Sequence, residues 1–103
     1  MQPFTKKVIE IMKSIPEGKV MSYGQVARTA GNPRSARQVA RILHSMSEKQ
    51  DIPWHRIVNA KGEIAIKDGE GRFTQRLLLE EEGLRFEEEG KVSLSRYQYF
   101  PDP

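Results

Sequence analysis

The chain contains no cysteine, and this absence excludes several kinds of chemistry. Without a thiol there can be no disulfide framework, no thiolate nucleophile and no cysteine-ligated metal. The two histidines, His44 and His55, do not have a spacing typical of metal ligands. The sequence therefore predicts neither a metal site nor redox chemistry.

Long apolar runs are also missing. No segment approaches the roughly 20 apolar residues that span a bilayer, and the N-terminus alternates apolar and basic residues instead of forming a secretory signal. Hydrophobic residues make up 37% and charged residues 30% of the 103 residues, which is typical of a globular protein. We expect one domain over residues 1–103, located in the cytoplasm and without a membrane partner.

Charge is unevenly distributed along the chain. Residues 1–61 carry 11 Lys+Arg and 4 Asp+Glu, a net charge of +7. Residues 62–103 carry 6 Lys+Arg and 10 Asp+Glu, a net charge of −4. A basic half beside an acidic half favours an oriented surface for a polyanion, although two ordinary solvated faces remain the alternative.

Apolar periodicity and capping residues predict four helices with short β elements between and after them. Ser22 is the expected N-cap of the second helix, and Asn32 followed by Pro33 marks the start of the third. The predicted helices run over residues 3–15, 23–30, 33–46 and 72–82. Short strands are expected at residues 57–59 and 63–66, with a hairpin or wing over residues 84–94.

The second and third predicted helices form a candidate helix-turn-helix. On a helical wheel Arg34, Arg37 and Arg41 share one face, opposite an apolar face suited to the core. The planar fork of a guanidinium matches two phosphate oxygens. General rules place such a helix in the major groove of DNA, whereas a solvated basic face is the alternative.

The only tryptophan lies in the tetrapeptide Pro53-Trp54-His55-Arg56. A His-Arg pair fixed behind a proline is typical of a site that positions a nucleophile, yet an indole is not a nucleophile. It offers a flat apolar face with one N–H donor instead. The segment therefore predicts a reactive pocket that has become a binding pocket.

Four ordered segments, residues 18–27, 31–39, 53–59 and 77–83, resemble the C-terminal DNA-binding domain of the O6-alkylguanine-DNA methyltransferases. They are more similar still to the alkyltransferase-like proteins, in which tryptophan or another residue replaces the reactive cysteine. The resemblance covers nearly the whole chain. It implies a winged helix-turn-helix-like fold that enters the minor groove, and a nucleotide rotated out of the duplex into a pocket.

The resemblance also implies roles for individual residues. Arg37 would enter the base stack where the nucleotide leaves, and Tyr23 would crowd the 3′ phosphate and promote rotation. The expected lesion pocket comprises Trp54, Leu43, Ile57, Lys67 and Asp68, with Lys67 standing where related proteins carry arginine. The expected contacts to the DNA backbone come from Ser22, Asn32, Arg34, Ser35, Gln38 and Arg41.

In the enzymes, the residues matching His55 and Glu82 activate the thiol through a water. Because this chain has no thiol, we interpret His55, Glu82 and Arg56 as a structural network and expect no catalytic residue. The predicted function is a non-enzymatic, monomeric sensor of O6-alkylguanine in double-stranded DNA, without a cofactor, that flags the site for nucleotide excision repair proteins. A helix-turn-helix transcription regulator and a weak base-lesion enzyme are the alternatives.

Overall fold

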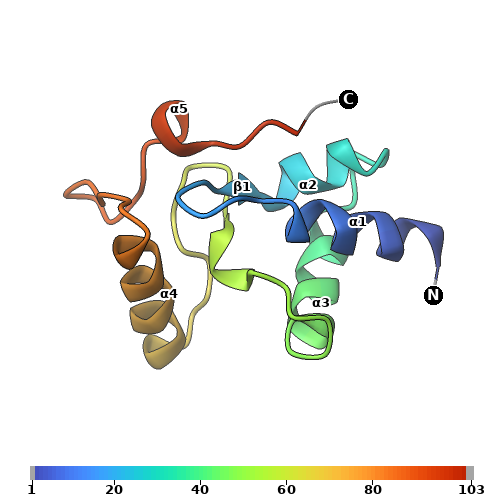
Figure 1. The fold of residues 1–103 in the computed structure, drawn as a ribbon, viewed down its shortest axis with the longest axis horizontal. Coiled ribbons are helices and arrows are strands. Elements are labelled where there is room, and N and C mark those ends of the chain that lie inside the picture. The colour runs from blue at the N-terminus through green and yellow to red at the C-terminus, as the bar shows by residue number, and fades with distance from the viewer. Residues whose placement is uncertain (1, 102–103) are drawn as a thin grey trace.

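The computed structural model describes residues 2–101 and is mainly helical, with one two-stranded sheet (Figure 1). This confirms the predicted fold class. In chain order the elements are α1 (Pro3–Lys13), β1 (Met21–Ser22), α2 (Tyr23–Thr29), α3 (Ala36–Met46), the 3-10 turn η1 (Trp54–Arg56), β2 (Ile57–Val58), α4 (Gly69–Glu81) and α5 (Leu94–Tyr97). None of these helices is long and apolar enough to cross a membrane.

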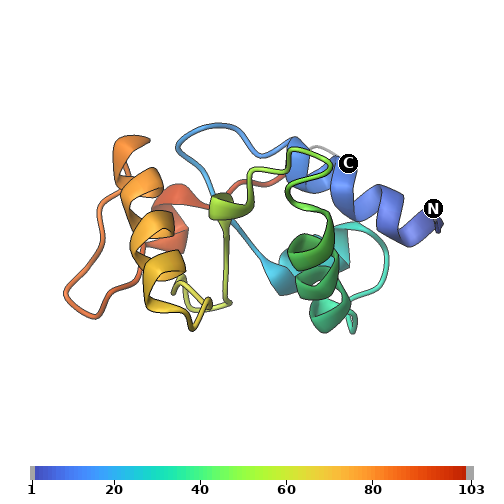
Figure 2. The same ribbon diagram turned by 90° about the horizontal axis from the view of Figure 1, so that it is seen from below.

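The buried apolar side chains form two separate clusters. The larger cluster joins α1, α2 and α3 through fully buried side chains such as Val8, Val26 and Val39. The smaller cluster lies under α4 and includes Leu79 and Val92. Figure 2 shows η1 between α4 on one side and α3 on the other. The turn that carries the tryptophan therefore occupies the junction of the two halves.

The sheet does not join the two strands predicted at residues 57–59 and 63–66 to each other. Strand β2 pairs in parallel with β1, in the register Met21 with Ile57, and residues 63–66 form no strand. The guanidinium of Arg72 donates hydrogen bonds to the carbonyls of Ile64 and Ile66, both at 3.0 Å, which removes these acceptors from a ladder. In the predicted wing, only isolated bridges form between residues 86 and 92 and between residues 63 and 91.

Helix α3 begins at Ala36 and not at Pro33 as predicted, because a turn closed by the Ser35 N–H and the Asn32 carbonyl (3.1 Å) comes first and Ser35 is the N-cap. The N–H of Asn32 donates to the carbonyl of Ala27 (2.9 Å), and the N–H of Gly31, at φ +96°, donates to the carbonyl of Arg28 (3.0 Å). This pair of bonds closes a helix C-terminus around a left-handed glycine. The next helix can begin only after the turn that follows.

The ends of two other helices also differ from the predicted bounds. Helix α4 begins at Gly69, three residues before the predicted start, because Asp68 is its N-cap and accepts a hydrogen bond from the N–H of Gly71 (2.8 Å). Helix α1 ends at Lys13, two residues before the predicted Ile15. The hydroxyl of Ser14 donates to the carbonyl of Ile11 (2.6 Å) at that end.

Candidate nucleic-acid interface

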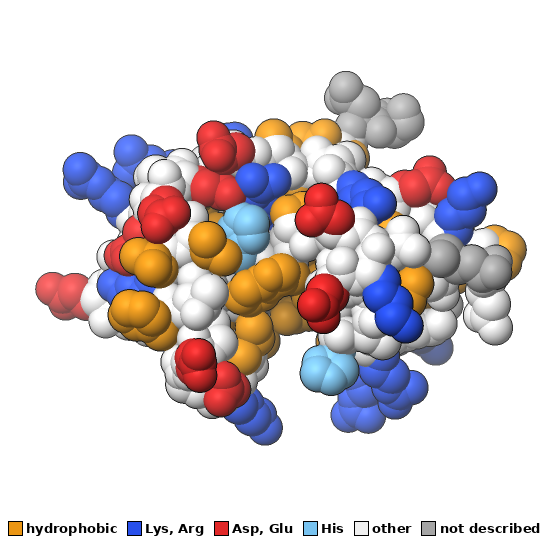
Figure 3. Space-filling model, turned by 60° about the horizontal axis from the view of Figure 1, so that its bottom comes forward, with side chains coloured by type: hydrophobic (Ala, Val, Ile, Leu, Met, Phe, Trp, Pro, Cys, Tyr) orange, Lys and Arg blue, Asp and Glu red, His pale blue; other side chains and the backbone are white. Residues whose placement is uncertain are grey.

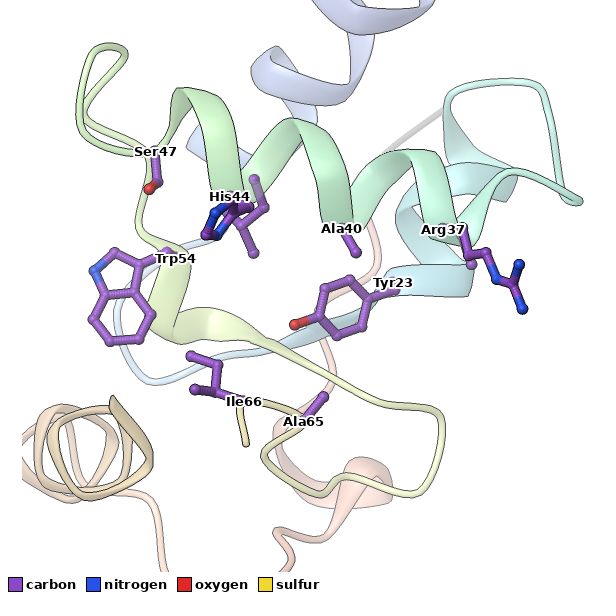
Figure 4. A pocket seen from close by; sticks show the side chains of 10 residues that line it. Tyr23, Arg37, Ala40, His44, Ser47, Trp54, Ala65 and Ile66 are labelled. Carbon is purple, nitrogen blue, oxygen red and sulfur yellow. The ribbon is translucent and has the colours of Figure 1, made fainter. Parts of the chain in front are cut away.

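A hollow of about 540 Å³ lies beside α3. Its lining residues come from the start of α2, one face of α3, η1 and the irregular segment before α4: Tyr23, Ala36, Arg37, Ala40, Leu43, His44, Ser47, Trp54, Ala65 and Ile66. Figure 4 shows Tyr23 and Arg37 at one end of this hollow, with His44, Ser47 and Trp54 at the other. The structure thus brings together four of the predicted flipping and pocket residues, Tyr23, Arg37, Leu43 and Trp54.

A capping box fixes Tyr23 at the entrance of α2. The hydroxyl of Ser22 accepts from the N–H of Gln25 (3.1 Å), and the side-chain carbonyl of Gln25 accepts from the N–H of Ser22 (3.4 Å). Burial raises the pKa of Tyr23, so its phenol stays neutral at physiological pH. The hydroxyl points into the hollow (Figure 4).

Two alanines form part of the wall of the hollow on α3. Ala36 and Ala40 lie one turn apart and are followed by His44, so one stripe of the helix leaves room beside Tyr23. Arg37 borders this stripe, and its exposed guanidinium extends from the rim (Figure 4). Sequence reasoning singled out Arg37 but missed the stripe, although its spacing of four residues was available as a signal.

Three predicted pocket residues do not line this hollow. Ile57 is fully buried in the main core as part of β2. Lys67 and Asp68 are exposed, and the Asp68 carboxylate is engaged as the N-cap of α4. Ala65 and Ile66 form that side of the hollow instead. These two residues were missed because nothing in an irregular segment predicts which way its side chains point.

The predicted phosphate contacts surround α3, with one exception. Asn32, Arg34 and Arg41 are exposed. Ser35 and Gln38 are half-buried. Ser22 is only 4% exposed and its hydroxyl serves the capping box, which argues against a phosphate contact from its side chain. Figure 3 shows apolar side chains gathered at the centre of one face, with Lys and Arg as well as Asp and Glu side chains around them.

Behind Trp54, the carboxylate of Glu82 connects the two halves of the molecule. It accepts hydrogen bonds from Arg56 (Nε 3.0 Å and Nη2 2.7 Å) and from the N–H of Gly18 (3.0 Å), and it lies 2.7 Å from Nε2 of His55. Burial alone would raise the pKa of Glu82, but the hydrogen bonds from Arg56, Gly18 and His55, together with the attraction of His55, lower it to about 2. Arg56 also donates to the carbonyl of Ile15 (2.9 Å).

This network fixes the turn that presents the tryptophan. The rings of Trp54 and His55 meet edge to face, with centroids 6.1 Å apart and planes at 82°. Because Glu82 fixes His55, it also sets the place of the indole. The structure therefore joins His55, Arg56 and Glu82 in one hydrogen-bonded cluster, and their structural, non-catalytic role stays a prediction.

Gln75 on α4 is a second anchor of η1, and sequence reasoning missed it. Its side-chain amide donates to the carbonyls of His55 (3.0 Å) and Ile57 (2.9 Å), and the residue is 1% exposed. A glutamine on a helix between charged residues gives no sequence signal of burial. Its role follows only from the packing of α4 against η1.

Substituting Gln75→Leu is expected to lower the free energy of unfolding by about 1–3 kcal/mol, because the buried carbonyl of Ile57 and the part-buried carbonyl of His55 lose their donor. Urea denaturation followed by circular dichroism measures this change. Phe73→Leu on the same helix is the matched control, since Phe73 is 69% exposed and should change stability by less than about 0.5 kcal/mol. Equal effects of the two substitutions would contradict the anchoring role.

Comparison with known proteins identifies the family. Residues 3–84 match the DNA binding domain of 6-O-methylguanine DNA methyltransferase. The chain belongs to this family. It is 42% identical over 96 residues to the DNA base-flipping protein of Escherichia coli strain K12, covering 93% of this chain and 74% of that protein. It is 37% identical over 106 residues to alkyltransferase-like protein 1 of Schizosaccharomyces pombe, covering 98% of both chains.

Solved structures of family members have the same fold. The crystal structure of S. pombe Atl1 in complex with damaged DNA containing O6-carboxymethylguanine matches with a TM-score of 0.83 and 36% identity, over 98% of each chain. The O6-methylguanine methyltransferase of Mycobacterium tuberculosis matches with a TM-score of 0.63 and 30% identity, over 80% of this chain and 49% of that protein. The predicted membership of the alkyltransferase-like group is confirmed.

Within this family, the chain cannot act as a cysteine alkyltransferase. Alkyl transfer to the protein requires a thiolate acceptor, and the sequence has no cysteine. Trp54 occupies the position that the sequence resemblance gives to the reactive residue, and it forms one wall of the hollow. The geometry can therefore hold a planar ligand, but it offers no sulfur nucleophile to react with one.

Proposed function

We propose that this protein is a non-enzymatic DNA damage sensor that binds O6-alkylguanine in duplex DNA through the minor groove. The observation that carries the proposal is the hollow itself, which has Tyr23 and Arg37 at one end and Trp54 at the other. The damaged nucleotide would rotate out of the helix and insert between these ends. No cofactor takes part in the proposed mechanism.

The dimensions and polarity of the hollow suit a flipped base. A volume of about 540 Å³ falls within the range of small-molecule sites. Its lining is mostly aliphatic and aromatic, so a planar base gains contact with Trp54 and Leu43 on entry. Extraction costs a few kcal/mol in lost pairing and stacking, and it costs least for a mispaired lesion. This difference favours alkylated over normal guanine.

Arg37 and Tyr23 are suited to lower the cost of rotation. The Arg37 side chain is exposed and makes no hydrogen bond or ion pair within residues 2–101, so its guanidinium can enter the stack and bond the orphaned base. The capping box fixes the backbone that carries Tyr23, and its ring packs partly against the core, so the side chain can displace a phosphate with little loss of its own entropy. Their roles follow the expectation from the sequence.

Two findings on relatives support the proposed partner. One relative is named a DNA base-flipping protein, and another has been solved with damaged DNA containing O6-carboxymethylguanine. Because this chain cannot remove the alkyl group onto a thiolate, the proposed output is a persistent complex that marks the lesion. We further propose that nucleotide excision repair proteins process this complex, and that the protein acts as a monomer in the cytoplasm.

The proposal predicts a difference between two duplexes of the same sequence. A duplex with one O6-methylguanine is expected to bind at least about tenfold more tightly than its undamaged twin, because the lesion is cheaper to extract. Fluorescence of Trp54, the only tryptophan, measures insertion of the base directly. Binding should also weaken steeply with salt because phosphate contacts release counterions. Equal affinity for both duplexes would overturn the proposal.

A further inference from the structure

Two polar side chains lie at the end of the hollow beside Trp54, whereas alanines line its middle. His44 and Ser47 lie three residues apart at the end of α3, and both line the hollow. Figure 4 shows them on the same side of the hollow, facing Trp54. Neither side chain makes a hydrogen bond within residues 2–101, whereas the neighbouring Ser45 hydroxyl bonds the carbonyl of Arg41 (3.0 Å). Their hydrogen-bonding groups are therefore available to a ligand.

This end of the hollow has no part in the proposed flipping. Tyr23 and Arg37 act at the opposite end, where the nucleotide would enter. The inference rests on the proposed function, in which the flipped base lies with its O6 substituent toward Trp54. By the sequence resemblance, Trp54 occupies the position of the residue that accepts the alkyl group in the enzymes. His44 and Ser47 then flank the substituent and not the purine ring.

A second hollow, of about 930 Å³, shares Ser47 and Trp54 with the first. Its other lining residues include the polar side chains of Glu48, Gln50 and Asp51. Polar side chains therefore surround Trp54 on the side of the second hollow as well.

We propose that His44 and Ser47 are specificity-determining residues that select O6 substituents carrying a hydrogen-bonding group. The ligand class is an O6-alkylguanine whose alkyl chain bears a hydroxyl or carbonyl oxygen. A substituent of this kind can bond both the exposed His44 imidazole and the half-buried Ser47 hydroxyl. An aliphatic chain of equal length displaces water from these groups without replacing its hydrogen bonds, and sites that lose such bonds discriminate against the analogue.

Comparing the affinities for two modified duplexes distinguishes a pocket that bonds the substituent from one that makes only apolar contacts with it. O6-(2-hydroxyethyl)guanine and O6-propylguanine have substituents of equal length and differ only in a terminal hydroxyl or methyl group. An apolar pocket favours propyl, because burying a methyl group is favourable and burying an unpaired hydroxyl is not. We expect the reverse, with the hydroxyethyl duplex bound about threefold to tenfold more tightly, as one or two neutral hydrogen bonds provide.

Variants locate the source of this preference. His44→Leu and Ser47→Ala are expected to abolish or invert it, and His44→Gln, which retains a donor and an acceptor, is expected to preserve it. Ser45→Ala is the matched control, because the Ser45 hydroxyl already bonds its own helix, and it should leave the preference unchanged. Affinity for undamaged duplex should be the same in all four variants as in the wild type.

Three outcomes would overturn the inference. Tighter binding of the propyl duplex by the wild type would show that the wall acts as an apolar one. A His44→Leu variant that weakens damaged and undamaged duplexes equally would show that His44 contacts phosphate. Equal binding of every modified and unmodified duplex by the wild type would overturn the proposed function together with this inference, whereas the first two outcomes leave lesion sensing intact.

Discussion

Glu82→Ala is expected to lower the free energy of unfolding by about 3 kcal/mol, because it removes the carboxylate that compensates Arg56 and leaves that charge partly buried. The side chains of Glu82, Arg56 and His55 are 9%, 17% and 14% exposed, so water cannot fully replace the lost partner. Urea denaturation at pH 7 measures the loss. Base insertion should weaken as well, since His55 and η1 lose the contact that places Trp54.

Glu81→Ala is the matched control for this prediction. Glu81 is the neighbouring residue, is exposed and makes no ion pair within residues 2–101, so its loss should change stability by less than about 0.5 kcal/mol. Glu82→Gln keeps the shape and removes the charge, and an intermediate loss is expected. A Glu82→Ala protein within 1 kcal/mol of the wild type would contradict the structural role of this network.

The same carboxylate makes a defined contribution to the acid stability of the fold. Its pKa is about 2 in the folded protein, against an ordinary value of 4.5, so the unfolded chain binds the proton more tightly. The stabilisation is therefore present above about pH 4.5 and is lost as the pH falls toward 2. Glu82→Gln removes this contribution, so the stability difference between wild type and variant should shrink over that interval.

Arg37→Ala is expected to reduce affinity for the O6-methylguanine duplex by about tenfold to a hundredfold, which is the range for hydrogen bonds from a charged group. The loss should be smaller for undamaged duplex, because only an extruded nucleotide leaves a vacancy for the guanidinium. The free energy of unfolding should not change, since the Arg37 side chain is exposed and makes no hydrogen bond or ion pair within residues 2–101. Parallel titrations of both duplexes measure this discrimination.

Two other substitutions test whether the effect belongs to this arginine. Arg41→Ala removes an exposed arginine from the same helix, and it should weaken damaged and undamaged duplexes by the same smaller factor. Arg37→Lys keeps the charge without the planar fork, and we expect it to recover only part of the affinity. If Arg37→Ala and Arg41→Ala proved indistinguishable, Arg37 would be one more phosphate contact and not the residue that fills the stack.

Local signals predicted α2 well, because a capping residue and its partner lie within four residues of each other in the sequence. Asn32 and Pro33 carried an equally strong local signal and misled, since residues 32–35 form a turn, closed by the Ser35 N–H and the Asn32 carbonyl, before α3 begins. The start of α4 was predicted too late because its first turn contains Gly69 and Gly71, which are poor helix formers. Whether a capping residue starts a helix at once or after a turn cannot be read from the cap alone.

Sequence reasoning found the candidate-site residues whose type is unexpected within their motif or on their helix face. Trp54 in a His-Arg motif and Arg37 on a basic face both met this condition. His44, Ser47 and Ala65 did not, because their importance depends on which distant segments close the hollow. Gln75 is the extreme case, since its burial and its two hydrogen bonds arise only when α4 packs on η1.

The distance along the chain between Glu82 and its partners has a consequence for protein synthesis. His55 and Arg56 are made 27 and 26 residues before the carboxylate that holds them, and a growing chain emerges from the ribosome in that order. The arginine-bearing helix can therefore be exposed while the tryptophan turn is still unanchored. The turn that places Trp54 therefore becomes anchored only after Glu82, the residue that follows α4, has been made.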